Sequence, residues 1–335
     1  MVLAELAQRV DDAARAEVAA LNGPHRAVYL TSRWKGRAVF AVLAAGEVTP
    51  SLVIKIDSHP AHKFRLHAEF AALTDLRQHP TMRGRVPGPL ALFDVGTYRV
   101  LAQTGLPGVP LNVILRRRLR ASRRVCGGDQ DRVLAWLADL QDTPATIRAP
   151  FDGKVALDRM RTTLGGRSVD SRPFLHAMSE QAQRWQDVSL PTTAGHGDLG
   201  PSNCLISSSG QVGVIDWEGG VGTRSPLVDI LIFLHHYARA LPTRQRRAAT
   251  GAFSRAFLAD GWLAELTASN VHRQLRRLGV PPAAAPLLVA STLADLASGE
   301  ARSAHSLRPG ARRHWSACLE AFAAGHERSL LGDLT

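Results

Sequence analysis

One segment of the chain constrains its fold more than any other: a loop rich in glycine and proline, followed by two short apolar runs. The loop, His-Gly-Asp-Leu-Gly-Pro-Ser-Asn, places Asp198 and Asn203 five residues apart, where glycine and proline exclude a regular helix. The apolar runs Cys204–Ile206 and Val212–Ile215 are separated by turn residues, which predicts a β-hairpin. Asn203 would begin one strand and Asp216 would follow the other. Since these two ends lie on the same side of a hairpin, we expect their side chains to converge.

Converging carboxylate and amide oxygens are the ligands that a hard divalent cation prefers. Mg²⁺ in particular is held by a few such ligands together with substrate phosphates. Asn203 and Asp216 are therefore the predicted metal ligands. Asp198 supplies a separate carboxylate that would accept the proton of an attacking hydroxyl, so it is the predicted catalytic base.

The motifs H-G-D-L-x-P-x-N and I-D-W-E resemble the catalytic and metal-binding loops of the aminoglycoside phosphotransferase and choline kinase family. Members of that family are relatives of the protein kinases, whose equivalent motifs are H-R-D-L-x-x-x-N and D-F-G. Content, order and separation all agree. The resemblance implies an α+β, bilobal protein-kinase-like fold, with a small β-rich N-lobe and a larger α-helical C-lobe. It also implies ATP or GTP as co-substrate, with Mg²⁺, in the cleft.

The order of predicted elements fits that architecture. An amphipathic helix is expected over residues 2–21, and a helix is expected to follow His59-Pro60. The break Thr-Gly-Leu-Pro-Gly at residues 104–108 is the best linker candidate, which predicts an N-terminal nucleotide-binding lobe over 1–104 and a catalytic, acceptor-binding lobe over 105–335. Strands are expected at residues 27–31, 38–43, 51–56, 90–95 and 98–102.

A kinase also needs a lysine on a strand and an acid on the following helix. Lys55 ends the run Val-Ile-Lys, and Glu69 lies between Leu66 and Leu73 on the apolar stripe of the next helix. A carboxylate on that stripe requires a partner, because an unpaired buried charge is strongly disfavoured. Lys55 is the natural partner, and it would hold the α- and β-phosphates.

The resemblance assigns further residues and also shows departures. Ala102, Gln103 and Thr104 would form the hinge whose backbone binds the nucleotide base, and Asp229 would brace the catalytic loop. The hairpin at residues 32–37 contains one glycine instead of a full glycine-rich loop. Gly200 stands where relatives often carry a basic or imidazole side chain near the transferred phosphate.

Composition limits the partners only broadly. The net charge of +12 comes mainly from arginine, and we interpret it as solvated surface charge, so no nucleic acid is expected as a partner. Three widely spaced cysteines and the lack of a signal peptide or a long apolar segment predict a cytoplasmic protein with no membrane partner. The adjacent pair His235-His236 is expected to be ordinary packing, since neighbours on a helix point about 100° apart. Oligomeric state is not predicted.

The expected function is a small-molecule kinase that transfers the γ-phosphoryl group of ATP or GTP to a hydroxyl. The acceptor is left open: an antibiotic, as in resistance-type phosphotransferases, or a sugar, a choline-like compound or another metabolic intermediate. A polycationic aminoglycoside would need an acidic pocket, and the net charge of +12 counts against it. A protein kinase and a catalytically inactive nucleotide-binding scaffold are the alternatives from other classes.

Overall fold

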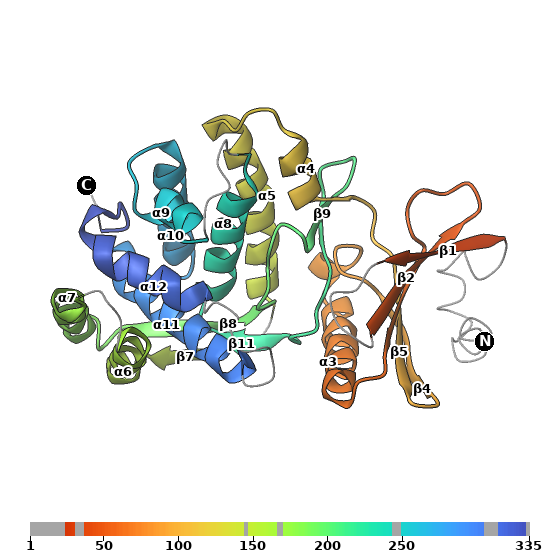
Figure 1. Cartoon of the computed structure of the whole chain (residues 1–335), viewed down its shortest axis with the longest axis horizontal. Coiled ribbons are helices and arrows are strands. Elements are labelled where there is room, and N and C mark those ends of the chain that lie inside the picture. Colours follow the sequence, from red (N-terminus) through yellow and green to blue (C-terminus); the bar gives the residue numbers. More distant parts are fainter. Residues whose placement is uncertain are drawn as a thin grey trace. The chain divides into compact units, whose positions relative to one another are not determined.

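The computed structural model describes residues 24–30, 37–143, 147–165, 170–242, 249–304 and 314–332. The expected helix over residues 2–21 and the tip of the predicted hairpin at 32–36 lie outside these described residues. The chain divides into two compact units (Figure 1). The N-terminal unit comprises residues 1–114, 135–143 and 201–222, and the helical unit comprises residues 115–134, 144–200 and 223–335. The predicted lobe boundary at residue 104 stays a prediction.

The N-terminal unit is built on a five-stranded antiparallel sheet with the strand order β1-β2-β3-β5-β4. All five strands were expected from their β-branched and aromatic residues, and the expectation is confirmed with small shifts of the ends. Gly96, with φ of 56°, allows the tight turn between the last two strands. The strands are β1 (His25–Leu30), β2 (Arg37–Ala44), β3 (Leu52–Asp57), β4 (Pro89–Val95) and β5 (Tyr98–Thr104).

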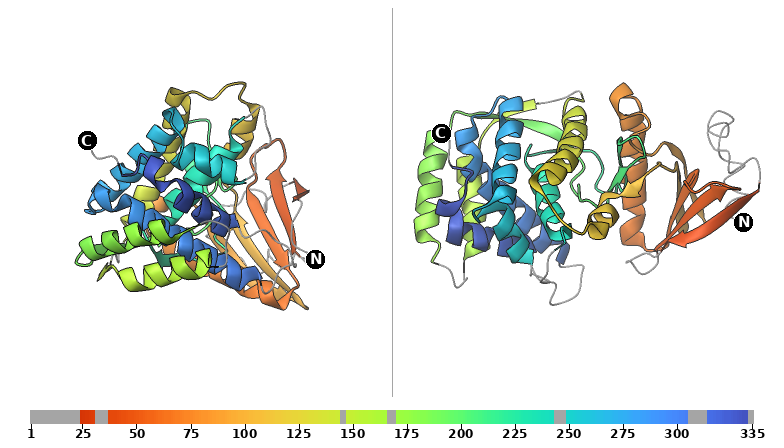
Figure 2. Two further views of the ribbon diagram at one scale, coloured as in Figure 1. Left: turned by 60° about the vertical axis from the view of Figure 1, so that its left-hand side comes forward. Right: turned by 90° about the horizontal axis from the view of Figure 1, so that it is seen from above.

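Helix α3 (Pro60–Arg77) lies along this sheet (Figures 1 and 2). Its residues Leu66 and Leu73 are fully buried, as the apolar periodicity predicted. A second apolar cluster is formed by the sheet itself, because alternate side chains of each strand point to one face. The buried members of that cluster are Val42, Leu52, Ile54, Ala91, Phe93, Val100 and Ala102.

The predicted hairpin after the Gly/Pro loop is present in the same unit. Strands β9 (Cys204–Ile206) and β10 (Val212–Val214) pair antiparallel, with Val214 opposite Cys204. Strand β6 (Val109–Pro110) extends them to a three-stranded sheet. The 3₁₀ turn η2 (Pro80–Met82) lies between α3 and β4, and helix α4 (Leu111–Arg117) follows β6 directly.

The helical unit has α11 (Ala285–Ala304) near its centre, in contact with α6, α7, α8, α10 and α12 (Figure 2). Helix α5 (Arg123–Gln141) contributes its first part to this unit and its last part to the N-terminal unit. A small sheet of order β11-β8-β7 precedes α8. The remaining elements are β7 (Ile147–Pro150), α6 (Gly153–Leu164), α7 (Arg172–Arg184), β8 (Ser189–Gly195), β11 (Gly222–Arg224), α8 (Val228–Ala240), α9 (Ala249–Phe257), α10 (Trp262–Arg277), η3 (Pro282–Ala284), α12 (His314–Gly325) and η4 (His326–Arg328).

The predicted α+β class is confirmed: an antiparallel β-sheet near the N-terminus is followed by a mainly helical remainder. Within the described residues, no helix has both the length and the apolar character needed to cross a bilayer.

Candidate functional site

The N-terminal unit holds a buried lysine among three carboxylates, which we call the lysine cluster: Lys55, Glu69, Asp216 and Glu218. Lys55 Nζ, on β3, lies 2.8 Å from both carboxylate oxygens of Glu69 on α3. It also lies 2.7 Å from Oδ1 of Asp216, just beyond β10, and 4.0 Å from Oε1 of Glu218. Three segments of the sequence thus meet at one ammonium group, although Lys55 and Asp216 are 161 positions apart.

Burial and charge oppose each other in the lysine cluster. Burial alone would lower the pKa of Lys55, but Glu69, Asp216 and Glu218 outweigh it and the pKa is raised, so the ammonium stays charged. Burial raises the pKa of Glu218 to about 7, and repulsion from Asp216 adds to the effect. The charge of Lys55 alone therefore does not balance the negative charge of the three carboxylates around it.

Asp216 is held in an unusual backbone conformation. Its φ of 73° is the only positive value among the described non-glycine residues, and such a conformation is worth a functional hypothesis. The residues on either side are anchored: Ile215 N donates to Asn203 O at 3.0 Å, and the buried Trp217 donates from Nε1 to Val214 O at 3.0 Å. This anchoring keeps the partly exposed carboxylate of Asp216 beside Lys55.

Asn203 lies where the sequence predicted, immediately before β9. Its carbonyl accepts from the residue that precedes Asp216, so the hairpin brings these two residues to the same end. The Asn203 side chain is largely buried, and its Oδ1 accepts a long hydrogen bond from the Ser202 hydroxyl. The expected hairpin arrangement is confirmed, and the metal-ligand roles stay predictions.

An arginine next to the lysine cluster was missed from the sequence. Arg37 at the start of β2 pairs with Asp57, at 3.2 Å from Nε to Oδ2, and with Glu218 through Nη1. Arg65 lies 3.9 Å from the other oxygen of Glu218. A signal was available, because Asp57 follows Lys55 by two positions on β3 and so points to the same face. Asp57 is fully buried, which explains why it needs a cationic partner.

The predicted hinge residues lie on β5, next to the strand that carries Lys55. Ala102 is opposite Ile54, and Gln103 is opposite Val53. The backbone N–H of Thr104 donates to Gly88 O at 2.8 Å, and the Thr104 hydroxyl accepts from Gly88 N at 2.7 Å. These contacts tie the end of β5 into the N-terminal unit, and the nucleotide-binding role of the three residues stays a prediction.

The predicted catalytic loop is described within the helical unit. The buried carboxylate of Asp229, in the first turn of α8, accepts from His196 N and from Gly197 N, each at 2.7 Å. Gly197 has a φ of 80°, which suits glycine. Asp198 N donates to His196 Nδ1 at 3.2 Å, and the Asp198 side chain is exposed. The loop is thus fixed through its backbone, as expected of a brace at Asp229, while the carboxylate of Asp198 faces solvent.

The chemistry of these residues suits a divalent cation and phosphates. Carboxylate oxygens of Glu69, Asp216 and Glu218 lie within 4.8 Å of one another. Both oxygens of the buried Glu69 contact Lys55, whereas Asp216 is partly exposed and, with the amide oxygen of Asn203, offers hard oxygen donors. Magnesium prefers such donors. A cation would also relieve the repulsion that raises the pKa of Glu218.

The chain matches a family model over most of its length and is similar to several solved structures. The family model described as the phosphotransferase enzyme family matches residues 27–266, well over half of the chain. Among solved structures, the choline kinase LicA from Streptococcus pneumoniae is 10% identical, with a TM-score of 0.49, 92% of this chain covered and 97% of that chain. The macrolide 2'-phosphotransferase MphH from Brachybacterium faecium is 19% identical, with a TM-score of 0.45 and coverages of 93% and 99%.

The aminoglycoside phosphotransferase APH(3'')-Id from Streptomyces rimosus, in complex with ADP and streptomycin, is 15% identical, with a TM-score of 0.44 and coverages of 94% and 99%. The family match agrees with the family that the two sequence motifs resemble. A search of curated proteins found no match.

Proposed function

The chain belongs to the phosphotransferase enzyme family, and from this premise we propose that it is a small-molecule kinase that transfers the γ-phosphoryl group of ATP or GTP to a hydroxyl. The observation that carries the proposal is the lysine cluster, in which a buried, charged Lys55 is fixed by Glu69 beside the carboxylate of Asp216. Such an arrangement positions phosphates and their counter-ion.

In the proposed mechanism Lys55 binds the α- and β-phosphates, and Glu69 holds its ammonium in place. Asn203 and Asp216 would hold Mg²⁺, which would supply positive charge to neutralise the phosphates. Asp198 accepts the proton of the acceptor hydroxyl as the acceptor oxygen bonds to the γ-phosphorus. The bond from that phosphorus to the bridging oxygen breaks, and the nucleoside diphosphate leaves. General-base assistance of this kind contributes about 10²–10⁴ in rate.

Asp229 has a positioning role in this proposal. Its carboxylate fixes two successive backbone N–H groups immediately before Asp198. Orientation of a reacting group contributes to catalysis without any contact with the substrate. We therefore expect Asp229 to act through the geometry of the loop.

The acceptor is proposed to be a small molecule and not a protein. Helix α8 begins at Val228, so residues 217–227 are all that separates it from Asp216. That stretch is too short for a long activation loop of the kind that protein kinases use. The net charge of +12 favours an uncharged or anionic acceptor over a polycation. An antibiotic, a sugar or another metabolic intermediate fits this description. A function in antibiotic resistance would require the acceptor to be an antibiotic.

The three cysteines of the chain are free, buried thiols in the structure. Free thiols favour a reducing compartment, so we also propose that the enzyme works in the cytoplasm.

The test is an ADP-release and GDP-release assay with Mg²⁺ across nucleoside antibiotics, macrolides, aminoglycosides, amino alcohols and sugars. The variant Asp198→Asn runs in parallel. We expect one class of acceptor to stimulate release and the variant to lose that stimulation. Release that is stimulated equally in Asp198→Asn would remove Asp198 from its role. Phosphate transfer to a protein such as casein, without any small acceptor, would overturn the small-molecule assignment.

A further inference from the structure

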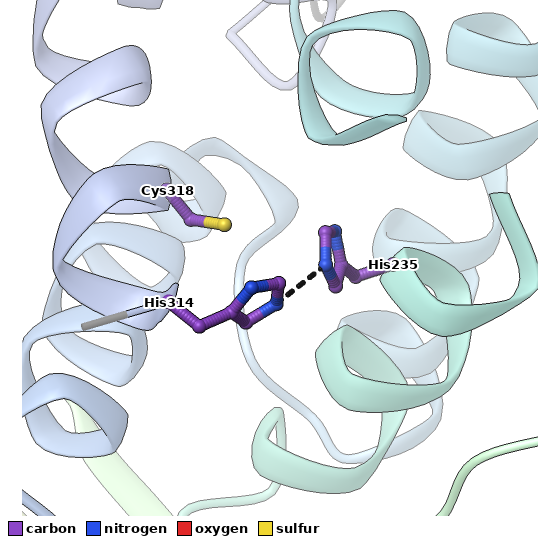
Figure 3. A group of neighbouring side chains, drawn as sticks. All are labelled: His235, His314 and Cys318. Carbon is purple, nitrogen blue, oxygen red and sulfur yellow. Dashed lines mark hydrogen bonds between the residues drawn. The ribbon is translucent and has the colours of Figure 1, made fainter. Parts of the chain in front are cut away.

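Two histidines and a cysteine that are far apart in the sequence meet inside the helical unit. We call them the histidine cluster: His235 on α8, and His314 and Cys318 on α12 (Figure 3). One ligand atom from each residue lies within 4.8 Å of the other two. His235 and Cys318 are fully buried, and His314 is half-buried. These residue types are those that bind zinc and related metals.

The helical spacing explains how α12 presents two of these groups. His314 and Cys318 are four residues apart, so they lie one above the other on the same face of the helix. His235 approaches that face from α8, while its neighbour His236 stacks on His314 with ring centroids 6.0 Å apart. From the sequence, the pair His235-His236 was expected to be ordinary packing. That expectation did not include His314, 79 positions after His235, or Cys318 beyond it.

The hydrogen bonding within the cluster is incomplete. Nε2 of His235 and Nε2 of His314 are 2.7 Å apart, so one ring donates and the other accepts. Nδ1 of His235 is buried and has no hydrogen-bond partner among the described residues. A buried nitrogen of this kind normally finds a partner. It is also where the proton of His235 would reside if Nε2 bound a metal.

The surroundings keep the cluster neutral in the absence of a metal. Burial lowers the pKa of His235 to about 2 and that of His314 to about 4, and the charge of Arg239 adds to both effects, so both imidazoles are unprotonated. Burial raises the pKa of the Cys318 thiol to about 12, with a contribution from Glu300 on α11. The two charged groups that act on the cluster are Arg239, one turn after His235, and Glu300, and their charges oppose each other.

An apolar wall surrounds these groups. The His235 ring lies 5.2 Å from the ring of Trp315 and 6.0 Å from that of Phe253. Such a wall controls the access of solvent to a metal and lowers the local dielectric constant.

We propose that His235, His314 and Cys318 form a site for a divalent transition metal, zinc first, which ties α12 to α8. The metal would be bound by Nε2 of each histidine and by the sulfur of Cys318, with water as a fourth ligand. Binding releases one proton, from the Cys318 thiol. The proton now shared between the two Nε2 atoms moves to an Nδ1 of its own ring, so that both imidazoles stay neutral.

The distance between the two histidine nitrogens requires only a small adjustment. Tetrahedral zinc with Zn–N of about 2.0–2.1 Å places two ligand nitrogens ~3.3 Å apart. The two Nε2 atoms are now 2.7 Å apart, so the rings would separate by a few tenths of an ångström. The mixed nitrogen and thiolate set fits zinc and cobalt(II) better than magnesium, which prefers oxygen. The site is therefore distinct in chemistry from the lysine cluster.

Cobalt(II) is the probe for the first test, because it is coloured and reports a thiolate ligand directly. We expect one equivalent of Co²⁺ to produce the d–d bands of a tetrahedral site and a sulfur-to-cobalt charge-transfer band. One equivalent of Zn²⁺ should remove both sets of bands. The full-length protein without a charge-transfer band at several equivalents of Co²⁺ would overturn the proposal.

Variants locate the thiolate. Cys318→Ala should lose the charge-transfer band, and the matched controls Cys126→Ala and Cys204→Ala, which remove the other two buried thiols, should keep it. If Cys318→Ala does not fold, as judged by circular dichroism, retention of the band in both controls still assigns the thiolate to Cys318. Loss of the band in either control with an intact fold, or its persistence in Cys318→Ala, would contradict the assignment.

Discussion

The lysine cluster and the histidine cluster solve the problem of buried polar groups in opposite ways. In the first, opposite charges are held at 2.7–2.8 Å from one another, and the pKa of Lys55 is raised so that the charge persists. In the second, burial lowers the pKa of His235 and His314 and raises that of Cys318, so every member is neutral. The lysine cluster is charged before any ligand binds, which suits a charged ligand. The histidine cluster becomes charged only when a metal binds and the Cys318 thiol loses its proton.

This difference predicts how much stability each cluster loses when one of its side chains is removed. Removal of one partner from a buried ion pair leaves an uncompensated charge, which costs several kcal/mol. Removal of one partner from a neutral hydrogen bond leaves a polar atom whose desolvation costs less. The loss of stability should therefore be largest for a substitution in the lysine cluster and smaller in the histidine cluster. A third site, where backbone N–H groups hold the charge of Asp229, should lie between them.

The largest effect is expected for Lys55→Met. Glu69 is fully buried, and without Lys55 its carboxylate has lost the ammonium that both of its oxygens contact. We expect the free energy of unfolding to fall by about 3–5 kcal/mol, measured by urea unfolding, together with loss of nucleotide binding. The double variant Lys55→Met, Glu69→Leu should recover much of the stability but none of the binding. If Lys55→Met alone were as stable as the wild type, the lysine cluster would not depend on its ion pairs, and the contrast with the neutral histidine cluster would be wrong.

The next effect is expected at Asp229, whose carboxylate accepts two backbone hydrogen bonds. A hydrogen bond to a charged group contributes about 1.5–3 kcal/mol. We expect Asp229→Ala to lose about the contribution of one such bond, because water can reach the half-buried Gly197 and replace the other. Since Asp229 acts on the loop before Asp198, kcat should fall more than KM rises. Asp229→Asn keeps one acceptor oxygen, so its stability and kcat should lie between those of the wild type and those of Asp229→Ala. A change confined to KM would contradict the positioning role.

A smaller effect is expected in the histidine cluster without metal. His314→Ala leaves Nε2 of the buried His235 without its 2.7 Å partner, and we expect a loss of about 1–3 kcal/mol in EDTA. Added Zn²⁺ should raise the melting temperature of the wild type. At 100 times the dissociation constant it would stabilise the protein by about 2.7 kcal/mol. Zinc should leave the variant unchanged, and equal stabilisation of both proteins would remove His314 from the site.

The smallest effect is expected for an ion pair on the surface of the same sheet that carries Lys55. Arg99 binds Asp94 through two hydrogen bonds of 2.8 Å, but both side chains are in contact with solvent. Exposed pairs contribute about 0–1 kcal/mol, so Arg99→Ala should shift the urea midpoint only slightly. Urea unfolding at low and high salt would measure this shift. A loss as large as that of Lys55→Met would mean that burial does not set the order.

The same two clusters show how far the sequence could predict the site. Lys55, Glu69 and Asp216 were found because each occupies a fixed place in a strand, a helix or a hairpin, and local periodicity reports on such places. Glu69 drew attention because a carboxylate on an apolar stripe needs a cation. The antiparallel hairpin then brought Asn203 to the end that leads into Asp216, as its short turn required.

What could not be predicted depends on tertiary contacts without a local signal. Arg37 meets Asp57 and Glu218 only after β2, β3 and the segment beyond β10 are assembled. Likewise, nothing near His235 in the sequence indicates that His314 and Cys318 will face it, because helix packing decides which faces of α8 and α12 meet. The positive φ of Asp216 was also hidden, since any Asp after a strand looks alike in sequence.

The central claim, that the lysine cluster binds a magnesium–nucleotide complex, is tested most directly by calorimetric titration of ATP and GTP with and without Mg²⁺. The wild type and Asp216→Asn are to be compared under the same conditions. We predict that Mg²⁺ tightens binding to the wild type at least about tenfold, or ~1.4 kcal/mol, and that Asp216→Asn loses most of this gain while still binding the free nucleotide. Nucleotide binding that ignores Mg²⁺ in the wild type, or no binding of either nucleotide, would contradict the claim.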